Sequence, residues 1–308
     1  MPIYNPAQQR VIELLGRGDI EPTFPAGIAD SLQAELEAAV APLADRLPPK
    51  LWVSKHGLSG VHGCEARHLA QEGDFAWSVA TVRGQVAHKA IELAVNWRGE
   101  PVAGDLVDEA VARLADADLS ASRFLGGLVE ADRAQLRGEA TDLVTKFQEC
   151  FPPLRSAWRP VTESRVYVDL LDGAVVLSGK VDLTLGKHEP GRATKVIIDL
   201  KSGFPAPVHR DDLRFYALLE TLRLGVPPRM LASYYLDAAR AQPEAVTVPL
   251  LEAALARAID GIHKMVSLAN GREPTLVPGP SCRWCPIADT CVEGQSWLWS
   301  AEEGGGDS

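Results

Sequence analysis

One short stretch, residues 179–201, limits most strongly what this chain can fold into. It contains Gly179-Lys180-Val181-Asp182-Leu183 and then Val196-Ile197-Ile198-Asp199-Leu200-Lys201. Both runs are short, apolar and rich in β-branched residues, which is typical of strands buried in a sheet. Because side chains alternate across a strand, Asp199 and Lys201 are predicted to project from the same face. If the two strands pair, Asp182 joins them there.

Two carboxylates and an ammonium on one sheet face form a candidate site for a divalent cation. Carboxylate oxygens are hard ligands of the kind that Mg²⁺ and Mn²⁺ bind, and the lysine adds a charged donor beside them. Cleavage of a phosphodiester requires an activated water and neutralisation of the charge that develops on phosphate, and a bound metal supplies both. The stretch therefore predicts metal-dependent cleavage of phosphodiesters.

The predicted secondary structure changes from mainly helices to strands and helices at about residue 150. Before it, the patterns predict helices over 5–16, 27–47, 79–98, 104–115 and 120–149, with a short extended segment at 51–54. After it they predict strands over 163–170, 174–185, 195–200 and 230–236, a hairpin turn at Asp172-Gly173, and helices over 209–224 and 250–269. The predicted fold class is α/β (α+β), with a small mixed central sheet flanked by helices.

The predicted organisation has four parts. Residues 1–150 form a helical N-terminal region that carries Cys64 and His88, and residues 151–270 form the core with the sheet. Residues 271–295 form a segment with three cysteines, and the Gly- and acid-rich residues 296–308 are predicted to be a disordered tail.

The charge distribution bears on nucleic-acid binding. The net charge of −10 argues against a general basic surface for phosphates. Between Gly179 and Met230, however, nine Lys/Arg stand against six Asp/Glu, a local balance of +3. Two of those six acids, Asp182 and Asp199, would be neutralised by a metal, so this segment is more basic than its formal count.

Two further classes are excluded or disfavoured by the sequence. No apolar run approaches the length of a bilayer span, and the N-terminus lacks the basic and apolar regions of a secretion signal, so we predict a cytoplasmic protein without a membrane partner. No Gly-x-x-x-x-Gly-Lys-Ser/Thr loop is present, which argues against an ATPase.

The spacing Gly-x-x-Asp, then Asp-x-Lys on a following strand, resembles the PD-(D/E)XK nuclease superfamily, on Gly179, Asp182, Asp199 and Lys201. Its RecB-like and CRISPR-associated iron–sulfur exonuclease-type members look most similar. The resemblance implies a restriction-endonuclease-like core and an Mg²⁺- or Mn²⁺-dependent deoxyribonuclease. It also implies exonuclease action on single-stranded or end-bearing DNA, a role in DNA repair or recombination, and a helicase or recombination partner.

The resemblance also implies roles for single residues. Asp182 and Asp199 would hold the metal, with His88 and the Leu200 carbonyl as further ligands. Lys201 would orient or deprotonate water and stabilise the scissile phosphate. A helical Gln-x-x-x-Tyr motif of the family is matched by Asp212-Leu213-Arg214-Phe215-Tyr216, where Tyr216 would contact substrate or support Lys201. Aspartate replaces glutamine at position 212, which leaves the role of that position open.

Two of the implied residues have an ordinary alternative. Helical periodicity places His88 about 180° from the apolar stripe of its helix, which by itself predicts a surface histidine. Glu163 matches a glutamate that the family carries on the strand before the Gly-x-x-Asp hairpin. It is equally well interpreted as a metal-shell residue or as an ordinary acid at a strand edge.

The cysteines follow a spacing that is typical of metal sites. Cys282, Cys285 and Cys291 give Cys-x₂-Cys-x₅-Cys, one thiolate short of the usual four for an iron–sulfur cluster. The resemblance implies a far-upstream fourth ligand, matched by Cys64, and hence a structural [4Fe–4S] cluster. Cys150 is then predicted to be a buried structural thiol.

Zinc is the alternative at the cysteines. The three clustered cysteines with His62, His68 or Cys64 would form a tetrahedral Zn²⁺ site.

Two hypotheses compete with the assignment of a nuclease. One is a weakly catalytic or non-catalytic DNA-binding subunit of a helicase–nuclease assembly, and the other is a zinc-stabilised interaction module in which the acidic pair is incidental.

Overall fold

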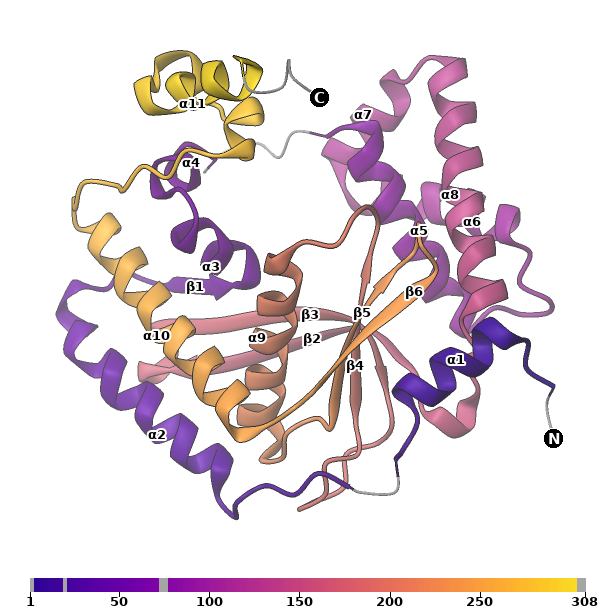
Figure 1. Ribbon diagram of the computed structural model, residues 1–308, viewed down its shortest axis with the longest axis horizontal. Helices are drawn as coiled ribbons and strands as arrows, with labels where there is room; N and C mark the ends of the chain where they lie inside the picture. The colour runs from indigo at the N-terminus through magenta and orange to yellow at the C-terminus, as the bar shows by residue number, and fades with distance from the viewer. Residues whose placement is uncertain (1–2, 19–20, 72–76, 304–308) are drawn as a thin grey trace. The chain divides into compact units, whose positions relative to one another are not determined.

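A computed structural model describes residues 3–18, 21–71 and 77–303 (Figure 1). The chain divides into two compact units, each assembled from three separate stretches. The first unit comprises Met1–Gln33, Trp77–Tyr167 and Gly179–Ala254, and the second comprises Ala34–Ala76, Val168–Ser178 and Leu255–Ser308. In the described residues, no helix has the length and apolar character needed to cross a membrane.

The helices follow one another in the order α1 Pro6–Leu15, α2 Ile28–Val40, α3 Lys55–His62, α4 Glu65–Ala70, α5 Val79–Val95, α6 Ala103–Ala117, α7 Leu119–Gly127, α8 Glu130–Cys150, α9 Pro207–Leu224, α10 Val248–Ala269 and α11 Val292–Glu303. The described residues also form short 3₁₀ helices: η1 Ala41–Arg46, η2 Ser156–Trp158, η3 Leu171–Gly173, η4 Pro280–Trp284 and η5 Ala288–Thr290. The strands are β1 Leu51–Ser54, β2 Val161–Leu170, β3 Val175–Leu185, β4 Val196–Lys201, β5 Met230–Tyr235 and β6 Arg240–Ala245.

The six strands found in the described part of the chain form one mixed sheet in the order β1-β3-β4-β5-β6, with β2 paired to β3. Strands β3 and β4 pair antiparallel, with Leu183 opposite Ile198, and β4 pairs parallel with β5 from Val196–Met230 to Lys201–Tyr235. Strand β6 is antiparallel to β5, and β1 is parallel to β3. This arrangement confirms the predicted mixed sheet flanked by helices.

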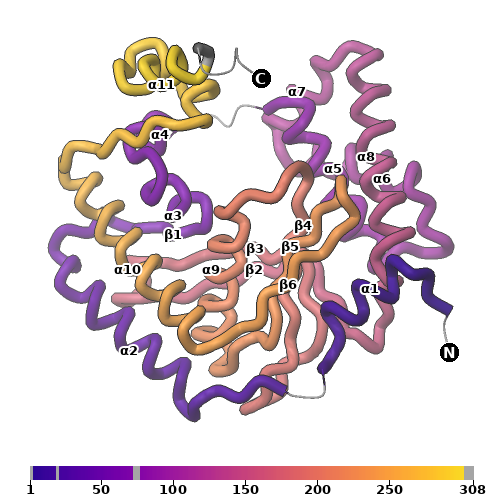
Figure 2. The backbone as a smooth tube through the Cα atoms, viewed as in Figure 1, coloured from indigo at the N-terminus to yellow at the C-terminus, as the bar shows by residue number. Residues whose placement is uncertain are grey.

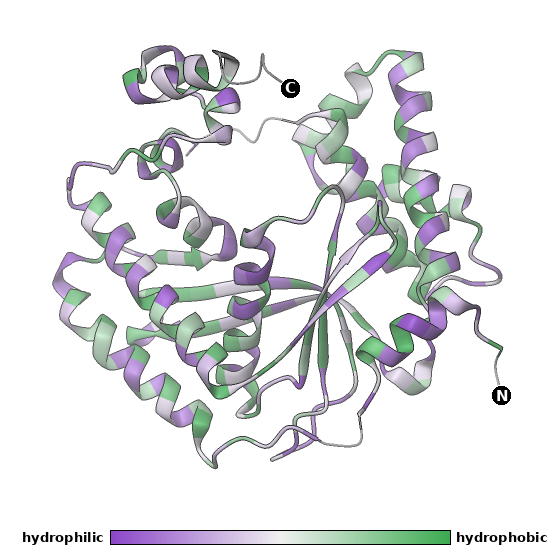
Figure 3. Cartoon of the chain, viewed as in Figure 1, coloured by the Kyte–Doolittle hydropathy of each residue, from purple (hydrophilic) through white to green (hydrophobic). Residues whose placement is uncertain are grey.

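The first unit holds an extensive apolar core. Helices α5, α6 and α8 pack against one another, and α9 packs against β4 and β5 (Figure 1). The β4 residues Val196–Leu200 are all buried, which explains their nearly continuous apolar sequence. Figure 3 shows polar and apolar bands alternating along α8, whose buried positions Leu136, Ala140, Leu143, Val144 and Phe147 follow the helical period.

The second unit places β1 and helices α3 and α4 beside much of α10, and Figure 2 follows its chain from α10 through η4 and η5 into α11. Gly261 of α10 faces Leu58 of α3 so closely that a Cβ atom there would collide with the leucine. Small residues at this crossing therefore let the two helices approach each other.

Several details of the structure differ from the sequence prediction, among them helices α3 and α4, which were not predicted, and the helix predicted over 27–47, which ends at Val40. The helix predicted over 120–149 is two helices, α7 and α8, because Gly126-Gly127 ends the first and Glu130 begins the second. Strand β6 was missed because Pro243 interrupts its pattern, which is tolerated on an edge strand. Residues 296–303, predicted to be disordered, continue helix α11, and 304–308 lie outside the described residues.

Gly179 marks the point where α9 lies directly against β3. A Cβ atom on Gly179 would lie 2.7 Å from Tyr216 Cε1 and 2.8 Å from Leu219 Cδ1, both on α9. Glycine is therefore needed in the Gly-x-x-Asp motif because the helix packs onto the strand at this residue.

Gly179→Ala should lower the free energy of unfolding by about 1–3 kcal/mol, since the added methyl group overpacks a well-filled contact. Gly138→Ala is the matched control, because Gly138 is exposed inside α8 and a Cβ there meets nothing within 4 Å. That control should be neutral or slightly stabilising. Urea unfolding of both variants measures the difference, and equal stability of Gly179→Ala and wild type would contradict the close packing.

Candidate active site and cysteine site

Asp182 lies on β3 beside β4, as the predicted pairing requires. Its Oδ2 accepts a hydrogen bond from the backbone N–H of Leu200 at 2.8 Å, just beyond the last paired residues of the two strands. The same oxygen lies 3.6 Å from Nδ1 of His88. The Asp182 side chain is 10% exposed, so its carboxylate is held in place and largely withdrawn from water.

Asp199 and Lys201 project from one face of β4, as predicted. Lys201 Nζ lies 2.7 Å from Asp199 Oδ2 and donates to Asp212 Oδ2 at 3.2 Å. The Asp199 side chain is 0% exposed. The lysine ammonium is therefore held between two carboxylates, one from its own strand and one from the first turns of α9.

Asp212 has a definite place in this arrangement. The sequence left its role open because the resembling family carries glutamine at this position. Its carboxylate gives Lys201 a charge-assisted partner, which an amide would replace with a weaker neutral acceptor. The α9 carboxylate is therefore a site residue whose contact was not anticipated.

His88 reaches the site from α5, where periodicity alone predicted a surface position. Its side chain is only 25% exposed, and it faces Asp182. The periodicity misled because α5 is buried on more than one side, with Gly84, Ala87 and Ile91 buried besides the expected stripe. Burial lowers the pKa of His88, but the negative charges of Asp182, Asp199 and Glu163 outweigh it and raise the pKa above its usual value.

Glu163 and Tyr216 both contact Lys180, the residue that follows Gly179. The Glu163 carboxylate forms a close ion pair with Lys180, across strands β2 and β3. The Tyr216 hydroxyl donates to the Lys180 carbonyl at 2.7 Å, and the tyrosine is buried. These contacts indicate that Tyr216 positions the backbone of β3 just before Asp182, a contact that the sequence did not anticipate.

The four predicted cluster cysteines lie together in the second unit. Cys64, Cys282, Cys285 and Cys291 all line one cavity. The thiols of Cys282 and Cys291 accept hydrogen bonds from the backbone N–H groups of Gly279 and Gly294, at 3.4 and 3.3 Å. Hydrogen bonds to sulfur are also found around the cysteine ligands of iron–sulfur clusters.

The residues predicted as alternatives lie elsewhere. His62 Nε2 lies 3.0 Å from the Arg257 carbonyl and its Nδ1 lies 3.4 Å from Asp260, so its ring is turned toward α10. Among the described residues around the cysteine cavity there is neither His62 nor His68. All five cysteines are free thiols, and Cys150, at the end of α8 in the first unit, is half-buried rather than fully buried.

Glu65 connects the Cys64 turn to the segment that leads to Cys282. Its buried carboxylate accepts a hydrogen bond from Arg272 at 2.7 Å and from the Thr275 backbone N–H at 2.8 Å. The Arg272 hydrogen bond, opposed by burial and assisted by the Thr275 N–H, lowers the pKa of Glu65 to about 2. These contacts fix α4 against residues 272–275.

Glu65→Gln should lower the free energy of unfolding by about 1.5–3 kcal/mol at pH 7, the usual contribution of a charged hydrogen bond. A lowered folded-state pKa means that the wild-type carboxylate stabilises the fold above the usual pKa of 4.5. That stability is lost as the pH falls from about 4.5 toward 2, so the variant should lose less than wild type over this range.

Thermal unfolding between pH 7 and the acid limit of reversibility measures this difference. Glu273→Gln is the matched control, because Glu273 is exposed in the same segment. An unchanged melting temperature of Glu65→Gln at pH 7 would show that the Arg272 contact does not hold the segment.

Side chains that could act as metal ligands are present, but they are not arranged as a complete ion-binding site. Across residues 3–18, 21–71 and 77–303, no three His, Cys, Asp or Glu side chains are grouped closely enough to hold a metal ion. At the sheet, the positive charge beside Asp199 is the Lys201 ammonium. The metal and cluster sites therefore stay predictions.

Comparison with known proteins gives one family match. The model of the PD-(D/E)XK nuclease superfamily matches residues 53–292, more than three quarters of the chain. The matched range includes His88, Asp182, Asp199, Lys201 and all four clustered cysteines. No curated protein sequence matches the chain.

Solved structures match at low identity, among them the following two. A putative exonuclease from Eubacterium rectale is 13% identical with a TM-score of 0.46, over 89% of this chain and 93% of that one. The protein SSO0001 is 13% identical with a TM-score of 0.35, over 86% of this chain and 96% of that one.

Proposed function

The chain belongs to the PD-(D/E)XK nuclease superfamily, and we propose that it is a metal-dependent deoxyribonuclease that hydrolyses phosphodiester bonds. One observation carries the proposal: Asp182, Asp199, Lys201 and His88 come from β3, β4 and α5 to the same place in the first unit. We further propose exonuclease action on single-stranded DNA or duplex ends, in DNA repair or recombination, with a helicase or recombination partner.

The proposal of a hard divalent cation is supported by the chemical type of these donors rather than by their spacing. Asp182 and Asp199 are withdrawn carboxylates, and His88 supplies an imidazole nitrogen within reach of the first. A bound Mg²⁺ or Mn²⁺ would be held by Asp182, Asp199, His88 and the Leu200 carbonyl. The negative charge of Glu163 also raises the pKa of His88. A bound ion would polarise the scissile phosphate and lower the pKa of a water molecule.

Lys201 is the residue that would contact the reacting groups beside the metal. Its ammonium can donate hydrogen bonds to a phosphate oxygen or to the attacking water, and Asp199 and Asp212 fix its position. The Leu200 N–H fixes Asp182, and Tyr216 fixes the strand that carries Asp182. The site is thus positioned by backbone and carboxylate contacts.

The cysteines support a second part of the proposal, a structural [4Fe–4S] cluster. Four free thiols line one cavity, two of them with backbone N–H donors, and four thiolates are the usual ligand set of such a cluster. The cluster would tie Cys64 to the segment after α10 within the second unit. Zinc held by the same thiolates is the alternative that metal analysis decides.

The test is purification of the full chain without oxygen, followed by cleavage assays on end-labelled single-stranded and duplex DNA. We expect cleavage with Mg²⁺ or Mn²⁺ and none with EDTA, together with about four iron atoms per chain. Absence of cleavage with tight DNA binding would favour the DNA-binding subunit instead. A colourless, zinc-loaded protein would overturn the cluster.

A further inference from the structure

A second cavity, of about 480 Å³, lies within the first unit at the ends of β3 and β4 away from the active site. Leu185, Gly186, Thr194 and Val196 line it, and of these Leu185 and Val196 lie three residues along the two strands from Asp182 and Asp199. The nuclease site uses none of these residues. The volume of the second cavity lies in the range of small-molecule sites, about 300–1,000 Å³.

The walls of this cavity are largely apolar and partly aromatic. Ile12 and Leu15 of α1 line it together with Phe151 and Trp158. Trp158 is half-buried, and its carbonyl accepts a hydrogen bond from the Gly186 N–H at 2.7 Å. This contact holds the Trp158 backbone beside the cavity, and its side chain, which lines the cavity, offers a flat surface for a planar ligand.

Arg229 lines the same cavity with a charge that is poorly compensated. The arginine is half-buried, and it donates to the Leu15 carbonyl, while its Nε is buried without a hydrogen-bond partner. Of the carboxylates in the described residues, none lies at ion-pair distance from it. Burial and the neighbouring Arg17 lower the pKa of Arg229, and Glu21 offsets this only in part.

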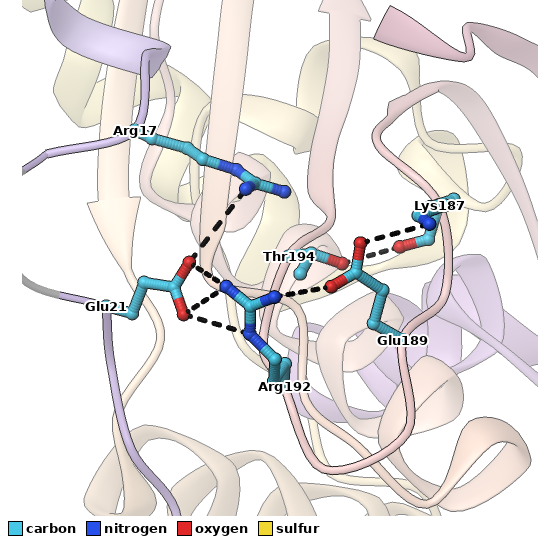
Figure 4. Close-up of polar contacts among 6 residues, drawn as sticks. All are labelled: Arg17, Glu21, Lys187, Glu189, Arg192 and Thr194. Atoms are coloured by element: carbon cyan, nitrogen blue, oxygen red, sulfur yellow. Dashed lines mark hydrogen bonds and ion pairs between the residues drawn. The ribbon is translucent and has the colours of Figure 1, made fainter.

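Glu21, whose negative charge acts on Arg229, is already shared among other cations (Figure 4). Glu21 Oε1 accepts from Arg192 at 2.6 Å and lies 3.9 Å from Arg17, and Glu189 pairs with both Arg192 and Lys187. Two carboxylates thus face four cationic side chains once Arg229 is included. Among the described residues that line the cavity itself, the charged ones are Arg17 and Arg229, both positive, beside an apolar interior.

We propose that this cavity binds a small anion with a planar apolar group, and that the ligand class is a nucleoside monophosphate. Arg229 and Arg17 would receive the phosphate, and the base would lie against Trp158 in the apolar interior. A half-buried guanidinium without a counter-ion is costly, and an anion that pairs with it removes that cost. The planar guanidinium also matches phosphate geometry. This site does not depend on the proposed nuclease activity.

Deoxyadenosine monophosphate is the probe, added to the full chain in the presence of EDTA so that no cleavage occurs. We expect it to raise the melting temperature and to give a saturable calorimetric signal. Deoxyadenosine lacks the charge and inorganic phosphate lacks the base, so each should bind at least tenfold more weakly. Failure of the nucleotide to bind at millimolar concentration would overturn the proposal.

Arg229→Met should weaken nucleotide binding at least tenfold while leaving the unliganded protein as stable as wild type or more stable, because an uncompensated charge is removed. A purely structural role through the Leu15 contact would instead lower stability. Ala157→Trp, which fills the cavity from an exposed lining position, should also block binding. Equal binding by wild type and Arg229→Met would overturn the proposal.

Arg155→Met is the matched control, because the exposed Arg155 guanidinium lies over the Tyr4 ring, 5.3 Å from its centroid, and does not line the cavity. It should bind the nucleotide like wild type. DNA cleavage by Arg229→Met should equal that of wild type, so failure of the nucleotide site and failure of the nuclease proposal can be told apart.

Discussion

Lys201→Ala should reduce the rate of DNA cleavage by about 10²–10⁴-fold while leaving DNA affinity nearly unchanged. The magnitude is that of a positioned group that exchanges or donates protons in the transition state. Lys201 is suited to this role because Asp199 and Asp212 hold its ammonium at 2.7 and 3.2 Å. Removal of the ammonium therefore removes an interaction that is already oriented, and the loss should appear in the cleavage step.

Single-turnover cleavage and fluorescence anisotropy on the same labelled strand separate the two effects. Lys187→Ala is the matched control, since it removes one positive charge from the same basic segment, at an exposed position outside the site. It should retain the wild-type cleavage rate. Wild-type turnover by Lys201→Ala would exclude the lysine from the reaction, and equal loss in both variants would point to general charge.

Cys64→Ser should remove the cluster and strongly destabilise the second unit. The cluster would link Cys64 to Cys282 across more than two hundred residues, and the chain-entropy model assigns such a closure about 5 kcal/mol. Loss of the link also releases the η4–α11 segment, in which Cys282, Cys285 and Cys291 lie. Few single substitutions in this chain should have a larger effect on stability.

Iron and acid-labile sulfide per chain, with thermal unfolding of the same sample, measure this prediction. Cys150→Ser is the matched control, because Cys150 lies in the first unit on α8. It should keep the iron content and melting temperature of wild type. Wild-type iron content in Cys64→Ser would show that the fourth ligand comes from elsewhere.

Much of the sheet and its acidic residues could be predicted because local sequence determines them. Alternation predicted Asp199 and Lys201 on one face, and the turn signal at Asp172-Gly173 predicted that β3 pairs with β2. The helix α9 was predicted to its C-terminal Gly225, which adopts a left-handed conformation with φ of 76°. These features depend on short-range patterns.

The rest depended on contacts between distant residues. His88 faces the site because α5 is buried on a second side, which a single apolar stripe does not reveal. Tyr216 supports the Lys180 carbonyl, and Asp212 reaches Lys201, because α9 crosses β3 and β4 at particular residues. Strand β6 is specified by pairing with β5, while its own sequence carries a proline. Sequence spacing cannot supply these tertiary contacts.

Asp199→Asn provides the most direct measurement of the proposed function. The substitution keeps the shape of a wholly buried side chain but removes the charge that would hold a divalent cation and that now pairs with Lys201. Cleavage of end-labelled single-stranded DNA in Mg²⁺ and in Mn²⁺ is compared with wild type, after thermal unfolding has shown that the variant is folded. We predict loss of metal-dependent cleavage in the folded variant, and cleavage at the wild-type rate would contradict a nuclease centred on Asp182, Asp199 and Lys201.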